Sequence, residues 1–155
     1  MKRLLFLIVG LFILSACIDQ TIKDIAKESK SPAFTINSFK EIPIEIEGCS
    51  CLFSESKTEY TKKEYLFAAS YDSAGFVSVD RKLIKLKLIS TERDPGTFGD
   101  YDHKNIYQGS GYTVTVDIHY KNSTGEEVWW NDGTITIRNT KGQQKSQKFV
   151  GECGC

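Results

Sequence analysis

The sequence predicts an all-β fold: a small antiparallel barrel or sandwich of about eight strands, clipped by disulfides. Two observations indicate this fold. From Phe34 onward, apolar residues alternate with polar ones at a period of two, which is the side-chain period of a half-buried strand. The alternating segments are short, and clusters of Gly, Asn, Asp and Ser separate them. A chain of 155 residues that loses a leader has the size of one such domain.

Residues 1–16 have the layout of a secretory signal peptide. Lys2 and Arg3 form a positive start, and residues 4–14 are apolar apart from Gly10. As a helix this apolar run would be ~17 Å long, whereas the hydrocarbon core of a bilayer is ~30 Å thick. We therefore expect a cleaved leader and not a transmembrane anchor.

The leader ends in Leu14-Ser15-Ala16-Cys17, which resembles the lipobox of bacterial lipoproteins. The resemblance implies that Cys17 becomes the first residue of the mature chain and carries a diacylglycerol. Two or more acyl chains anchor a protein stably to a membrane. Ile18 follows in place of the aspartate that favours inner-membrane retention in enteric bacteria. The expected location is therefore the cell envelope, on the outer membrane where the organism has one. An ordinary cleaved leader is the alternative.

Residues 17–32 are expected to form the lipidated tether of a β domain that spans residues 33–155. Charges of both signs alternate along the tether, which is typical of a solvated spacer. Ile18, Ile22 and Ile25 recur at helical spacing, so the alternative is a short amphipathic helix lying on the membrane.

The charge of the chain argues against a nucleic-acid partner. Basic and acidic side chains number 20 each, and loss of the leader removes Lys2 and Arg3. The mature chain is thus slightly acidic, while nucleic-acid binding requires a clustered basic surface. The same balance disfavours electrostatic docking on acidic lipid, so the lipid on Cys17 would hold the protein at the membrane by itself.

The β domain is predicted to begin with an edge strand at residues 42–46, where Pro43 interrupts the alternating isoleucines. Further strands are expected at residues 65–71, 76–80, 84–88, 113–120 and 134–138. The expected turns contain residues that tolerate positive φ and lie at residues 72–75, 122–125, 131–133 and 139–142. No segment after the tether carries a sustained helical stripe.

Besides Cys17, the chain has two Cys-x-Cys pairs, formed by Cys49, Cys51, Cys153 and Cys155. Exported chains meet an oxidising compartment, so disulfides are expected. A bridge within one pair would form a cramped ring. If the two pairs lie on neighbouring antiparallel strands, the bridges are nested, Cys49 with Cys155 and Cys51 with Cys153. A four-thiolate zinc site is the alternative, although zinc sites usually space their cysteines by about two to four residues.

Candidate catalytic and metal-binding residues are few. His119 and Asp117 share a face of a predicted strand, an arrangement that could orient an imidazole for base catalysis but is more typical of a surface ion pair. Asp94, Asp100 and Asp102 could gather calcium, yet the EF-hand spacing is absent. No catalytic or phosphate-binding motif occurs in the sequence. We expect a non-catalytic protein without cofactor or metal.

Aromatic residues are better candidates for a binding surface. Trp129 and Trp130 are neighbours on a predicted strand, so one side chain should face inward and the other outward. The outward indole could stack on a glycan or anchor a protein partner, with Tyr101, Tyr107 or Tyr112 nearby. The alternative is that both tryptophans are half-buried structural residues.

The second half of the chain carries a series of short motifs, at residues 67–71, 76–80 and 83–88, Ser110-Gly111-Tyr112, Trp129-Trp130 and Gly133. Their order is similar to that in the periplasmic and lipid-anchored inhibitors of c-type lysozyme. The resemblance implies a small antiparallel barrel clipped by a disulfide near its end. It also implies that Ser110 belongs to a loop that enters the lysozyme cleft. Asp132 stands where that family has a lysine, and the acidic cleft should repel it.

The sequence thus predicts a lipid-anchored envelope lipoprotein with a non-catalytic binding or structural domain. The candidate binding surface comprises Trp129, Trp130, Ser110 and Tyr112. An inhibitor of a cell-wall-degrading enzyme is the alternative, and an enzyme that uses His119 is the third hypothesis.

Overall fold

The computed structural model describes residues 34–155, except residues 72 and 94–101. The leader, the tether and Cys17 lie outside the described residues, as do Asp94, Asp100 and Tyr101. Ala33–Cys155 is a compact unit that contains all described strands, both disulfides and the hydrophobic core. Because the described core and both disulfides belong to this one unit, we expect it to fold alone. In the part of the chain that the structure describes, every helix is too short or too polar to cross a bilayer.

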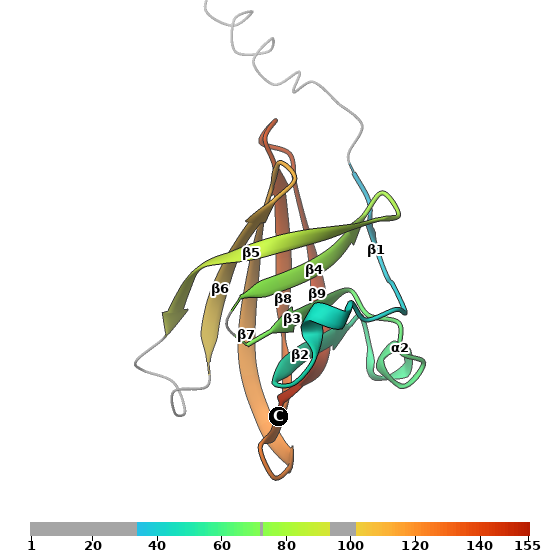
Figure 1. Ribbon diagram of the computed structural model, residues 1–155, viewed down its shortest axis with the longest axis vertical. Coiled ribbons are helices and arrows are strands. Elements are labelled where there is room, and N and C mark those ends of the chain that lie inside the picture. The colour runs from blue at the N-terminus through green and yellow to red at the C-terminus, as the bar shows by residue number, and fades with distance from the viewer. Residues whose placement is uncertain (1–33, 72, 94–101) are drawn as a thin grey trace, which may run out of the picture. The chain divides into compact units, whose positions relative to one another are not determined.

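Eight strands of the described chain form a closed antiparallel barrel (Figure 1), which confirms the all-β prediction. They are β2 (Ser50–Ser54), β3 (Phe67–Ser70), β4 (Ala74–Val79), β5 (Lys82–Arg93), β6 (His103–Gly109), β7 (Tyr112–Gly125), β8 (Val128–Asn139) and β9 (Gln144–Gly154). Each strand pairs with the next along the chain, and β9 pairs with β2 to close the ring. Each of these strands has a hydrogen-bonded neighbour on both sides over part of its length, so the ring is closed.

Short elements flank the barrel strands. β1 (Ile36–Asn37) pairs with β4 beyond the point where β3 begins. The helix α2 (Lys57–Thr61) begins after Ser56, whose side chain accepts a hydrogen bond from the Glu59 N–H. This single helical turn was not predicted, because five residues are too few to show a helical stripe.

The predicted edge strand at residues 42–46 is wrong, because Ile44–Ile46 is the 3-10 turn η2. Pro43 precedes η2 with a φ of −59°, a value that suits the start of a helical turn. Ile46 is buried on the outer faces of β3 and β4, beside Phe76, while Ile44 is 76% exposed. Only one of the alternating isoleucines therefore finds an apolar surface, whereas a strand would have placed all of them on one face.

The predicted turn at residues 131–133 is also wrong, because these residues lie within β8. Gly133 provides close packing there, not positive φ. A Cβ atom on Gly133 would lie 1.9 Å from the backbone oxygen of Asp117 and 2.6 Å from Cζ of Phe149. By contrast, the turn predicted at residues 139–142 is confirmed: Asn139 accepts hydrogen bonds from the backbone of Lys141 and Gln143 there.

The barrel interior changes in character along its length. At one end it is filled by branched aliphatic side chains that belong to four strands, such as Val79 of β4, Ile84 of β5, Val114 of β7 and Ile137 of β8. Next comes a layer of three phenylalanines, which we call the aromatic layer: Phe53, Phe67 and Phe149. The ring centroid of Phe53 lies 4.1 Å from that of Phe149 and 6.3 Å from that of Phe67. Beyond the aromatic layer, inward side chains become smaller and more polar.

Two disulfides join β2 to β9, the pair of strands that closes the barrel. Cys51 lies opposite Cys153 in the strand register and is bonded to it, and Cys49 is bonded to Cys155. The nested pairing expected for neighbouring antiparallel strands is therefore confirmed. A zinc site built from these four cysteines is excluded, since each sulfur is already bonded to another.

Candidate functional site

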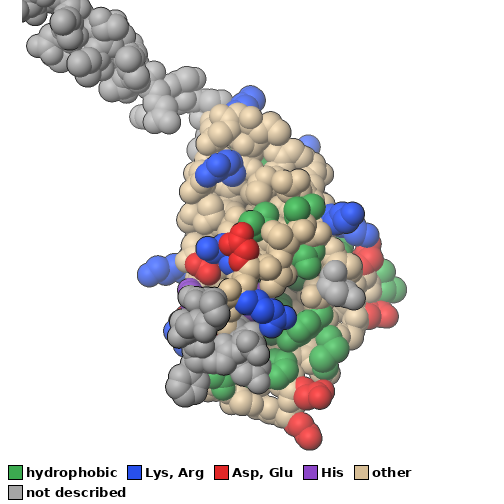
Figure 2. All heavy atoms as spheres, turned by 90° about the vertical axis from the view of Figure 1, so that its left-hand side faces the viewer, with side chains coloured by type: hydrophobic (Ala, Val, Ile, Leu, Met, Phe, Trp, Pro, Cys, Tyr) green, Lys and Arg blue, Asp and Glu red, His purple; other side chains and the backbone are tan. Residues whose placement is uncertain are grey.

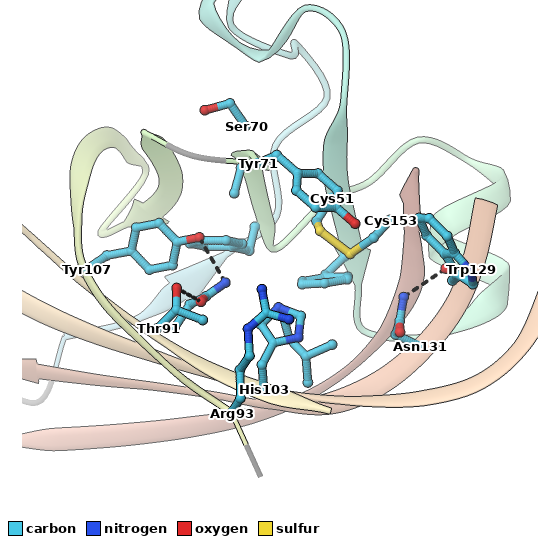
Figure 3. A pocket seen from close by; sticks show the side chains of 15 residues that line it. Cys51, Ser70, Tyr71, Thr91, Arg93, His103, Tyr107, Trp129, Asn131 and Cys153 are labelled. Atoms are coloured by element: carbon cyan, nitrogen blue, oxygen red, sulfur yellow. Dashed lines mark hydrogen bonds between the residues drawn. A yellow bond between two sulfur atoms is a disulfide. The ribbon is translucent and has the colours of Figure 1, made fainter. Parts of the chain in front are cut away.

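The barrel is hollow at one end, where a cavity of about 440 Å³ opens to solvent. We call this cavity the end pocket. Figure 3 shows the 15 side chains that line it. They come from the aromatic layer and from the strand ends beyond it, in seven of the eight barrel strands, and from Tyr71 after β3. Ligand sites in proteins commonly measure ~300–1,000 Å³, so the end pocket has room for one small molecule.

The end pocket exists because small side chains face inward at this end of the barrel. Ala69 follows Phe67 on the inner face of β3, and Cys51 precedes Phe53 on the inner face of β2. The alanine methyl and the Cys51–Cys153 disulfide leave space at this end of the barrel. Two residues deeper in the barrel, the phenylalanine rings of the same two strands fill the corresponding space. The aromatic layer closes the floor of the pocket. The cavity is therefore a short cup and not a tunnel through the barrel.

A β-bulge in β5 decides which of its side chains face the end pocket. The register between β5 and β6 shifts between Leu88 and Ser90, so Ile89 is the extra residue. Before the bulge, even-numbered residues such as Leu88 pack on the core, and Ile89 itself is 53% exposed. After the bulge, odd-numbered residues face inward.

The bulge thereby decides which charged side chain of β5 faces the pocket. Thr91 and Arg93 line the end pocket, and Figure 3 shows the Arg93 side chain pointing into it next to His103. Unbroken alternation from Leu88 would have turned Glu92 inward instead. Of the lining residues that the structure describes, none is an aspartate or glutamate. Arg93 supplies a permanently charged group to this described part of the wall.

A chain of hydrogen bonds orients polar groups along one side of the end pocket (Figure 3). The Thr91 hydroxyl donates to Oδ1 of Asn105 at 2.7 Å, and Nδ2 of Asn105 donates to the Tyr107 hydroxyl oxygen across a longer 3.5 Å. Tyr107 is 2% exposed, and desolvation by burial raises the pKa of its phenol to about 12, partly offset by the Asn105 hydrogen bond. Tyr107 therefore stays protonated and keeps its own O–H as a donor.

Trp129 and Trp130 face opposite sides of β8, as predicted. Trp129 lines the end pocket, where its backbone oxygen accepts a hydrogen bond from Nδ2 of Asn131. Trp130 packs edge-on against Tyr60 of α2 at 5.2 Å, and the Lys57 ammonium lies 5.3 Å from its ring centroid. The outer indole thus helps to hold α2 on the barrel, while the inner one belongs to the pocket.

Ser110 and Tyr112 lie at the opposite end of the barrel from the tryptophans. Ser110 occupies the tight turn between β6 and β7, and the Tyr112 ring packs edge-on against Phe34 at 5.6 Å. Tyr112 is the first residue of β7, whereas Trp130 pairs with Asn122 near the other end of that strand. About ten residues of strand span ~33 Å, so the structure does not bring these candidate residues together.

His119 lies on the outer surface between two carboxylates. Its Nδ1 is 3.4 Å from Asp102 and its Nε2 is 3.9 Å from Asp117, and the imidazole is 48% exposed. Asp102 also accepts the backbone N–H of Tyr120 at 2.8 Å. These contacts tie the start of β6 to β7 and form a surface ion-pair group. Among the described residues no cluster of three His, Cys, Asp or Glu is placed to hold a metal ion.

Sequence reasoning missed most of the end pocket. Arg93, His103, Asn105 and Thr91 were not singled out as one site, since their convergence depends on barrel closure and on the bulge in β5. A signal was nevertheless present: Leu88 and Ile89 are adjacent apolar residues that break the alternation of β5. Such a break indicates a bulge, after which the inward set of residues switches.

Comparisons with known proteins found no relative of this chain. No protein-family model matches the chain, and neither a curated protein nor a solved structure matches it significantly.

Proposed function

We propose that this chain is a lipid-anchored protein of the cell envelope whose barrel binds a small molecule in the end pocket without chemical conversion. The end pocket carries the proposal. An eight-stranded barrel is just wide enough to be filled by side chains or to hold one small ligand. Here the aliphatic end and the aromatic layer are filled, and the end beyond them is hollow. The lipobox-like sequence at residues 14–17 supports a location in the cell envelope.

The lining chemistry supports a binding role. Tyr107, Trp129 and the aromatic layer offer apolar contact area, while Thr91, Asn131 and other polar groups can fix an orientation. Ligand sites typically combine such apolar walls with a few placed polar groups. The Cys51–Cys153 disulfide stiffens the wall opposite Arg93, as Figure 3 shows. A stiff wall lowers the entropy that binding would otherwise cost.

The binding proposal is tested with an uncharged fluorescent probe, N-phenyl-1-naphthylamine, and the Ala33–Cys155 unit. We expect saturable binding of about one probe per chain. Ala69→Phe should abolish it, because the new ring fills the cavity beside Ala69. Ser110→Ala, at the other end of the barrel, is the matched control and should bind like the wild type. Near-ultraviolet circular dichroism verifies that both variants are folded. Probe binding that survives Ala69→Phe would refute the end pocket as the site.

The lysozyme-inhibitor alternative receives less support from the geometry. The resemblance implies two loops that act together, one with Ser110 and one at Asp132. Asp132 lies within β8, pairs with His119 of β7 and forms a 2.9 Å ion pair with Lys121. Ser110 is about nine residues away along β7, or ~30 Å. This separation favours the binding proposal over the inhibitor alternative.

A further inference from the structure

The two disulfides between β2 and β9 differ in their exposure to solvent. Cys49 and Cys155 form the outer bridge, which joins the residue before β2 to the residue after β9, and both cysteines are exposed. Cys51 and Cys153 form the inner bridge and are only 9% and 5% exposed. Both inner cysteines line the end pocket. One bridge is thus presented to solvent, while the other belongs to the interior of the barrel.

Exposure governs how fast a disulfide exchanges with thiols, because a thiolate must reach one of the two sulfur atoms. At the outer bridge the thiolate can approach from water. At the inner bridge it would have to enter the end pocket, where it loses part of the hydration that stabilises its charge. The outer bridge should therefore be reduced much faster than the inner one, although the two lie side by side on the same pair of strands.

Backbone contacts hold the outer cysteines together even without their bond. The backbone N–H of Tyr71 donates to the Cys49 oxygen at 3.1 Å, and the N–H of Cys155 donates to the Glu127 oxygen at 3.2 Å. The paired register of β2 and β9 begins at the residues next to the two cysteines. Free thiols at Cys49 and Cys155 would therefore stay close to each other, so oxidation should restore the same bridge.

The inner bridge keeps the barrel closed while the outer bridge is open. The cysteines of the two bridges are 106 and 102 positions apart in the sequence, so the inner bridge alone closes nearly the same loop. The strand pairing from Ser50 to Ser54 against β9 does not need the outer bond either. Reduction of the outer bridge should therefore leave the barrel folded.

We infer that the Cys49–Cys155 bridge is a site of thiol–disulfide exchange with dithiols, while the Cys51–Cys153 bridge is structural. One thiolate of the dithiol attacks a sulfur of the outer bridge, and the other cysteine leaves as a thiolate and takes up a proton. The second thiol of the dithiol then attacks the mixed disulfide and releases the first cysteine. Two electrons and two protons pass to the outer cysteines, which become thiols, and the dithiol is oxidised to a disulfide.

The test treats the full chain with dithiothreitol and follows each cysteine separately. Charged side chains of both signs are scattered over the face shown in Figure 2, so a reagent without charged groups other than its thiols restricts the comparison to access. Samples are quenched with acid and labelled with N-ethylmaleimide in denaturant, and fragment mass spectra assign the label to individual cysteines. We expect labelling of the outer pair to be at least ~10-fold faster than labelling of the inner pair. Equal rates, or faster labelling of the inner pair, would overturn the inference.

The same samples report whether the barrel stays folded during the exchange. When the outer pair is reduced and the inner pair is not, the aromatic bands of the near-ultraviolet circular dichroism spectrum should be unchanged. Replacement of dithiothreitol by oxidised glutathione should restore the bond between Cys49 and Cys155. Loss of the aromatic bands in step with reduction of the outer pair, or reoxidation to a different pairing, would contradict the inference.

Two double variants separate the effect of exposure from the order of reduction. Cys51→Ala with Cys153→Ala leaves only the outer bridge, which should be reduced at about the wild-type rate. Cys49→Ala with Cys155→Ala is the matched control: it leaves only the inner bridge, which should be reduced at least ~10-fold more slowly. Equally fast reduction in the two variants would mean that the outer bridge, and not burial, protects the inner one, and the assignment would fail. The wild-type measurement needs no variant, so it decides the inference even if a double variant does not fold.

Discussion

At the scale of one residue, Gly133 shows that a glycine in a turn-like sequence can be required for close packing within a strand. In the sequence, Asn131-Asp132-Gly133 has the composition of a turn. In the structure, Gly133 lies in mid-strand beneath the Phe149 ring, where a Cβ atom has no space. The glycine thus permits the aromatic layer to pack, and the aromatic layer in turn forms the floor of the end pocket.

Gly133→Ala should therefore destabilise the barrel by about 2–3 kcal/mol, because the methyl group forces backbone and ring apart. Gly125→Ala is the matched control: a Cβ there meets Val128 at an ordinary 3.7 Å, so the change should be nearly neutral. Urea denaturation of both variants measures the free energy of unfolding. Equal stability of the two variants would contradict the packing explanation.

At the scale of elements, the seam between β2 and β9 holds the barrel closed. The two disulfides cross it within two residues of each other, and their sequence separations are 106 and 102. Either bridge alone closes nearly the same loop in the unfolded chain. The two are therefore redundant in chain entropy, while the inner one also forms part of the pocket wall.

Removing only the outer pair, Cys49→Ala with Cys155→Ala, should cost about 1 kcal/mol or less, because the inner bridge still closes the loop. Removing all four cysteines should cost about 4–5 kcal/mol, the loop-closure entropy of a loop of ~100 residues. Denaturant unfolding measures both values. A cost as large for the outer pair as for both pairs would disprove the redundancy.

The bulge in β5 shows that the orientation of side chains along a strand depends on its pairing with a neighbouring strand as well as on its own sequence pattern. The alternation of Ile84, Leu86 and Leu88 predicted a strand, and the strand exists. The sequence pattern did not extend to Arg93, because its inward orientation depends on the register against β6. Register is a property of two strands together, so a single-strand pattern leaves it open.

At the scale of the whole molecule, the closed barrel and the disulfide pairing follow from the sequence, while the end pocket does not. Two-residue periodicity and short turns determine the fold class, and the Cys-x-Cys spacing suits two facing strands. The pocket exists because the side chains of Ala69 and Cys51 are small. The local alternation of apolar and polar residues does not indicate where the barrel interior is left unfilled. Residues that line it come from seven strands, so only the closed barrel assembles them.

The proposed membrane anchor is also a property of the whole molecule, and substitution of Cys17 tests it. We expect the chain expressed in a bacterial host to incorporate radiolabelled palmitate and to sediment with membranes. Cys17→Ser should abolish both, since acyl chains supply the membrane affinity and the slightly acidic mature chain supplies none. Cys155→Ser, which removes a different cysteine, is the control and should remain labelled. Membrane sedimentation of Cys17→Ser without label would refute lipid anchoring.

Barrel closure by β2 and β9 also sets the order of events during biogenesis. The first barrel strand must wait for the last one, since the cysteines of the inner bridge are 102 positions apart in the sequence. Contacts so distant in sequence make folding slow. A chain that lacks its final strand presents an incomplete ring with two bare edges. If the leader directs export, as we propose, closure of the ring and oxidation of the cysteines would both follow translocation of that final strand.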